Sequence, residues 1–143
     1  MKKFIISLII CSAIYSQLSA RAGLILPSEE HSPNLISIGA GYSLLHQENL
    51  SVGLIGEYAF PTESGTELNV FEIGGGLLYH MADHISAIAS VMYSAESAHG
   101  ESHSDVIFLA GLGYELIDHL ELEAVYGVNG NIKGPRFAVA FHF

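Results

Sequence analysis

The chain has 143 residues, a formal net charge of −10 and a composition that is 50% hydrophobic and only 14% charged. Such an acidic chain excludes nucleic acid as a partner, because phosphate binding needs clustered lysines and arginines. The single cysteine, Cys11, excludes a disulfide framework, and the length suits one domain.

The first residues have the layout of a secretory signal peptide. Two lysines precede an apolar run at residues 4–14, and Ala20, Arg21 and Ala22 match the small-residue pattern of a cleavage site. The run is shorter than the roughly 20 apolar residues that a membrane-spanning helix needs, which disfavours a retained anchor. We therefore predict that cleavage after Ala22 removes residues 1–22 and leaves one domain, residues 23–143.

Hydrophobic residues recur with period two along the rest of the chain, which predicts short strands. These strands lie near residues 35–45, 50–60, 69–80, 85–95, 106–116, 120–128 and 136–143. The short connections are 46–49, 81–84 and 117–119, and the longer, polar ones are 61–67, 96–105 and 129–135. Short turns that alternate with longer loops favour an up-and-down antiparallel barrel in a membrane over a sandwich.

Seven clear strands leave the barrel one strand short, because bacterial membrane barrels have an even number. The only segment that can supply another strand is the short apolar stretch before Pro27. We predict an all-β barrel of about eight strands in which a short first strand near 22–27 closes against 136–143. Two alternatives are closure by another chain and an N-terminal segment that is truncated or degenerate.

The two faces of the predicted strands differ in character. Every Tyr and Phe after residue 22 falls on one face with Leu, Ile and Val, and the other face is mainly Gly, Ser and Glu. Small residues suit the narrow lumen of a barrel of about eight strands. Aromatic residues near both strand ends flank an aliphatic band, as at a bilayer interface. We therefore expect the aromatic face to meet lipid, and a soluble lipid-binding barrel, with that face inward, is the alternative.

The hairpin at residues 111–126 reads Gly-x-Gly-Tyr-x-Leu, a turn containing Asp118, then Leu-x-Leu-x-Ala-x-Tyr. It resembles the hairpins of small OmpA/OmpX-type outer-membrane barrels in the porin-like superfamily. The last strand, with Phe137, Phe141 and a terminal Phe143, resembles the signal that such proteins present to the barrel-assembly machinery. The resemblance implies the outer membrane of a Gram-negative bacterium, with its lipids and that machinery as partners.

We expect a structural or surface-interaction role with no catalytic, cofactor or metal site, and the sequence names no ligand. The alternative is a cation-preferring pore or transporter, because carboxylates recur on the polar face near the strand ends. These are Glu57, Glu72, Glu115, Glu121 and Glu123, with Arg136 and His142 as the evident counter-charges. Carboxylates without a partner are costly to bury, but a barrel this small is usually filled.

The longest polar connection suggests two further hypotheses. Ligand-type side chains alternate there, at His99, Glu101, His103 and Asp105, and an extended backbone would project them to one side, as a zinc or copper site requires. We favour a solvated loop. The same stretch, with His142, also supplies the residue types of an outer-membrane acyl hydrolase. Because nothing in the sequence brings these residues together, we expect no enzyme.

Overall fold

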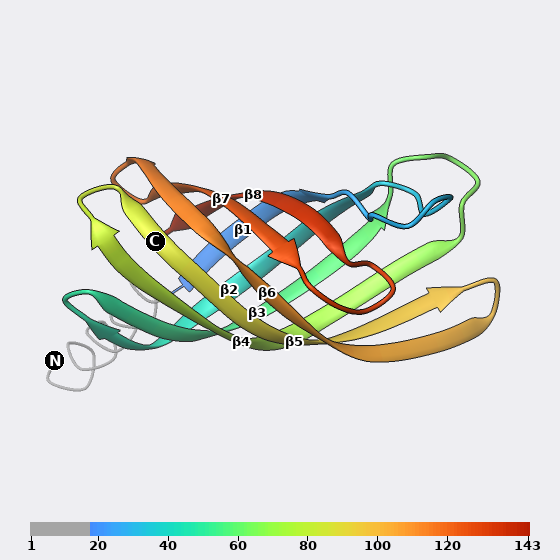
Figure 1. Ribbon diagram of the computed structural model, residues 1–143, viewed down its shortest axis with the longest axis horizontal. Coiled ribbons are helices and arrows are strands. Elements are labelled where there is room, and N and C mark those ends of the chain that lie inside the picture. Colours follow the sequence, from blue (N-terminus) through green and yellow to red (C-terminus); the bar gives the residue numbers. More distant parts are fainter. Residues whose placement is uncertain (1–17) are drawn as a thin grey trace, which may run out of the picture.

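The computed structural model describes residues 18–143 as one closed barrel in which every strand pairs with its neighbours in the sequence and β1 pairs with β8 (Figure 1). The strands are β1 Leu18–Ile25, β2 Leu35–Gln47, β3 Leu50–Pro61, β4 Leu68–Ala82, β5 Ile85–Ala98, β6 Glu101–Ile117, β7 Leu120–Gly127 and β8 Gly134–His142. This arrangement confirms the predicted up-and-down antiparallel barrel. Within the described part of the chain, no helix is long and apolar enough to cross a membrane.

The predicted first strand exists and closes the barrel, but it begins earlier than expected. It spans Leu18–Ile25, and its residues pair with β2 on one side and β8 on the other. Most of the predicted signal peptide lies outside the described residues, yet residues 18–22 belong to this strand. The strand ends before Pro27, which has no N–H to continue a ladder.

The two ends of the barrel differ as the sequence predicted, with one correction. Tight turns connect β2–β3, β4–β5 and β6–β7 at the end where the C-terminus lies, which we call the turn end (Figure 1). Loops 26–34, 62–67 and 128–133 lie at the opposite end, the loop end. The expected loop at 96–105 is instead a hairpin with a two-residue turn, His99 and Gly100, whose φ angles of 50° and 81° fit the turns that match strand twist.

The large apolar face points outward, as predicted. Ile38, Leu54 and Leu112 are 55%, 52% and 53% exposed, although each lies within a strand. The lumen face carries the small residues, and two glycines show why. A Cβ on Gly74 would lie 2.0 Å from the Val91 carbonyl oxygen, and one on Gly111 would lie 2.1 Å from that of Ala124. The sheet of this narrow barrel curves so strongly that the backbone of the next strand leaves no room for a side chain at these two positions.

Candidate functional sites in the lumen and at the hairpin tip

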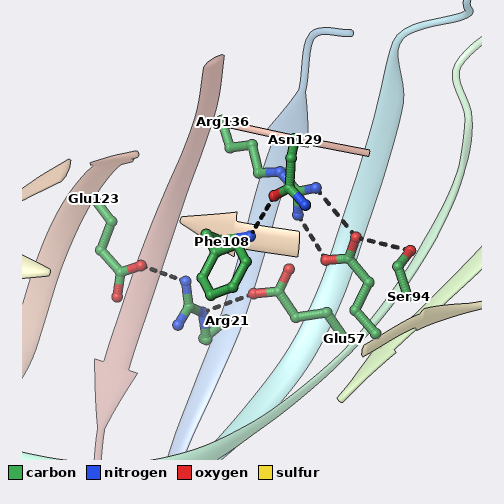
Figure 2. Close-up of polar contacts among 8 residues, drawn as sticks. Arg21, Glu57, Ser94, Phe108, Glu123, Asn129 and Arg136 are labelled. Atoms are coloured by element: carbon green, nitrogen blue, oxygen red, sulfur yellow. Dashed lines mark hydrogen bonds and ion pairs between the residues drawn. The ribbon is translucent and has the colours of Figure 1, made fainter. Parts of the chain in front are cut away.

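An ion pair spans the lumen between strands on opposite sides of the barrel. Arg136 on β8 donates through Nη1 to Glu72 Oε2 on β4 at 2.6 Å and through Nη2 to Oε1 at 3.1 Å. Both side chains are buried, and Ser94 Oγ donates to Glu72 Oε1 at 3.4 Å (Figure 2). A bidentate, charge-assisted pair holds both groups in fixed geometry. The pair therefore crosses the lumen and links β8 to β4.

A second arginine, Arg21, which lies within the predicted leader, bridges two more carboxylates. Arg21 Nε lies 3.0 Å from Glu57 Oε1 on β3, and its Nη2 donates to Glu123 Oε2 on β7 (Figure 2). The register places Arg21 beside Gly39 and Gly39 beside Glu57, so a residue without a side chain separates the two ions. Continuing the period-two pattern backward from Ile25 would have placed Arg21 on the lumen face.

The turn end of the lumen holds the third polar contact. His142 Nε2 lies 3.4 Å from Glu121 Oε2, and this carboxylate is almost fully buried while the imidazole is half exposed. Glu115 lies opposite Glu121 in the β6–β7 register. Of the carboxylates predicted on the polar face, Glu57, Glu72 and Glu123 thus lie beside an arginine and Glu121 lies beside His142.

Apolar side chains close the lumen on the loop-end side of the ion pairs. Ile25, Leu35, Ala59 and Val70 come from the first four strands, and Ile132 folds in from the β7–β8 loop. Each is at most 3% exposed. The small cavity beside the two arginines measures ≈ 20 Å³, enough for about one water molecule. Within residues 18–143 this apolar cluster thus closes the loop end of the lumen.

The β5–β6 hairpin projects beyond the rest of the loop end (Figure 1). Its last aromatic residues are Tyr93 on β5 and Phe108 on β6, both about half exposed on the outer face. Ala98 lies five residues beyond Tyr93, which corresponds to roughly 16 Å of strand. The tip therefore lies outside the aromatic girdle, where a strand meets water on both faces.

One edge of this projecting hairpin is open. Pairing between β6 and β7 stops at Leu109 and Gly127. The Asn129 side chain then mimics one more strand residue. Its Oδ1 accepts from Phe108 N–H at 2.8 Å (Figure 2), and its Nδ2 donates to Val106 O at 2.6 Å. Asp105 Oδ1 accepts from Val106 N–H at 2.8 Å.

Beyond Val106 only β5 pairs with β6 among the described residues. Backbone groups alternate in direction along an antiparallel strand, so those of Ser102 and Ser104 point the same way as those of Val106. Two N–H and two C=O groups therefore face solvent in a row. An unpaired row of this kind is a template for another strand.

The strand geometry separates the residues of the hydrolase hypothesis. His103 and Asp105 lie on the lumen side of β6, Ser104 lies on the outer side, and His142 lies at the turn end. Adjacent residues of a strand point to opposite faces, so Ser104 and its neighbours do not converge.

The metal hypothesis gains no support from the projecting strand. Extension does place Glu101, His103 and Asp105 on one side. Residues 18–143, however, contain no group of three His, Cys, Asp or Glu side chains arranged to hold a metal ion.

Glu96 on β5 lies opposite His103 in the β5–β6 register. Burial raises the pKa of Glu96, and the Asn131 side chain and His103 partly oppose this shift.

Comparisons with known proteins establish the fold class. No family model and no curated protein matches the chain. Among solved structures, a de novo designed transmembrane β-barrel matches with a TM-score of 0.69 and 19% identity over 90% of this chain and 96% of that chain. The designed barrel TMB2.3 gives 0.65 and 20% over 90% and 94%. The outer-membrane protein Ail of Yersinia pestis in a nanodisc gives 0.50 and 14% over 90% and 99%. The chain thus has the fold of a small eight-stranded transmembrane β-barrel.

Proposed function

We propose that the protein is a non-conducting, non-catalytic barrel of a Gram-negative outer membrane that captures an extended peptide segment on the open edge of β6. The observation that carries this proposal is the row of unpaired backbone groups at Ser102 and Ser104, outside the aromatic girdle. Addition of a strand to an exposed sheet edge is a general mode of peptide recognition.

Charge around the edge favours a cationic partner. Glu101 and Asp105 flank the two serines, and Glu96 lies on the adjoining strand. Like charges oppose pairing of this edge with the same edge of a second copy, whereas a segment with alternating lysines gains attraction that falls with salt.

The outer face supports residence among lipids, and the fold supports an OmpA/OmpX-type barrel. Every strand carries exposed large apolar or aromatic side chains on its outer face. This exterior argues against the alternative of a soluble lipid-binding barrel, which keeps its apolar face inward. We propose outer-membrane lipids and the barrel-assembly machinery, which would read β8 up to Phe143, as partners. Membrane fractionation and heat-modifiable migration on gels test this placement.

The edge is tested with a probe peptide of alternating lysine and valine. Ser104→Pro removes one open-edge N–H while the β5 ladder, which uses His103, is kept. Ser104→Ala is the matched control because it changes only the side chain. We expect wild type and S104A in nanodiscs to bind the labelled peptide and S104P to bind it at least tenfold more weakly. Equal binding by S104P would refute strand addition.

The non-conducting part is tested separately in planar bilayers. The apolar cluster around Ile132 and the ion pair between Arg136 and Glu72 both lie across the lumen and should block ions. We therefore expect no single-channel steps. Steady cation-selective steps would favour the pore alternative instead.

A further inference from the structure

The first half of β1 is part of the barrel wall. Residues 18–22 form five of the eight residues of the strand. They pair with β2 from Leu18 to Ala22, and from Ser19 onward with β8 as well. Phe143 N–H also donates to the Leu18 carbonyl at 3.0 Å. Cleavage after Ala22 would remove these contacts from both neighbouring strands and leave only three residues to close the barrel.

The lumen needs the cation that this segment carries. Arg21 is 13% exposed and lies between Glu57 and Glu123, which are 12% and 5% exposed. Glu57 also lies opposite Glu72 in the β3–β4 register, so two carboxylates already face one another on adjacent strands. Without Arg21, both Glu57 and Glu123 would lose their ion-pair partner, and a buried carboxylate without one is strongly unfavourable.

We propose that the mature protein retains Arg21 and that leader removal occurs N-terminal to it, upstream of Leu18 as the strand pairing indicates. The apparent A-x-A motif of Ala20 to Ala22 is then a stretch of barrel wall and no processing site. The step hydrolyses one peptide bond and consumes one water. It leaves a carboxylate on the leader and a new amino group on the barrel, near the turn end.

Strand alternation explains why this stretch imitates a cleavage motif. Ala20 and Ala22 are exposed on the outer face, and Arg21 between them points into the lumen. Small residues on either side of a lumen cation therefore have a structural cause that is independent of a peptidase.

The direct test is the N-terminus of the protein purified from the membrane fraction of cells that express the full chain. We expect intact mass and N-terminal sequencing to give a first residue at or before Leu18. A mature chain that begins after Leu18, such as one beginning at Gly23, would overturn the proposal. Ala22→Leu provides a second readout, since it destroys the small-residue requirement at the apparent site and adds only an outward apolar side chain. Unchanged processing of A22L supports the proposal, and blocked processing contradicts it.

A third readout separates the cation from the strand. Arg21→Met keeps the full backbone and the aliphatic stem but removes the charge, and Arg21→Lys restores a charge. In urea titrations of barrels folded into vesicles, we expect R21M to lower the folded-to-unfolded ratio by about 100-fold or more, with partial recovery in R21K. A ratio in R21M equal to that of wild type would show that Arg21 is dispensable to the lumen. None of these readouts depends on peptide capture at β6, so the two proposals fail independently.

Discussion

Removal of Arg136 should destabilise the barrel far more than removal of an exposed cation. In Arg136→Leu the Glu72 carboxylate, whose side chain is 2% exposed, loses two hydrogen bonds of 2.6 and 3.1 Å and keeps only Ser94 at 3.4 Å. Loss of one partner of a buried pair costs about 3–5 kcal/mol. The control is Lys133→Leu, which breaks an ion pair with Glu29 that is 46% exposed on both sides. Such a pair contributes about 0–1 kcal/mol.

The assay is urea unfolding of the barrel in lipid vesicles, with the folded fraction read from heat-modifiable gel migration because the chain has no tryptophan. The double variant Glu72→Leu with Arg136→Leu removes both charges together, so it should lose less stability than R136L alone. The reasoning is refuted if R136L costs no more than K133L, or if the double variant loses the sum of the two single changes.

Three further changes test the wall and the hairpin by the same titration. Gly74→Ala should destabilise the barrel by about 1–3 kcal/mol because its Cβ would overlap the wall backbone. Gly75→Ala should cost less than about 1 kcal/mol, because a Cβ there points outward and has its nearest neighbouring atom 3.8 Å away. Equal costs for the two variants would contradict the steric account. Burial raises the pKa of Glu96 above 4.5, so the folded barrel binds a proton at this carboxyl more tightly than the unfolded chain does. This contribution to the stability of the fold is present at low pH and is lost as the pH rises through the raised pKa. Glu96→Gln should therefore exceed wild type in stability at pH 7, with an advantage that shrinks toward pH 4, and an advantage independent of pH would argue against burial as the cause. Ile132→Ser should lower stability by opening the apolar cluster, and an unchanged urea midpoint would show that the loop does not pack into the lumen.

The wall of the barrel was predictable because its side chains repeat every second residue. Tyr93 and Val91 point outward while Ser94 and Met92 point inward, and the same alternation continues through each neighbouring strand. One buried face and one lipid face fix the register strongly, so the pattern survives in the sequence without any alignment. Gly111 could likewise be placed on the lumen face, although the close approach of the Ala124 carbonyl follows only from the curvature of the closed wall.

The projecting hairpin was missed because it lies outside the environment that produces this pattern. Near the tip both faces of β5 and β6 meet water, so polar residues such as Ser102 and Glu101 occupy both sides and resemble a loop. Pairing of the two strands there depends on backbone groups, which no side-chain periodicity reports. The two-residue turn at His99 and Gly100 was the local sign that the strands continue to the tip.

The lumen position of Arg21 could not be predicted from its local sequence, because its contacts involve partners that are distant in the sequence. Its hydrogen bond to Glu123 spans 102 residues, and the bond between Arg136 and Glu72 spans 64. A cleavage motif is local and was therefore recognised first. The barrel places the arginine strands β1 and β8 side by side, and their partner carboxylates come from β3, β4 and β7. Closure of the wall and balance of the lumen charge thus depend on one another, because the strand that closes the ring also delivers the cation that makes two buried carboxylates tolerable.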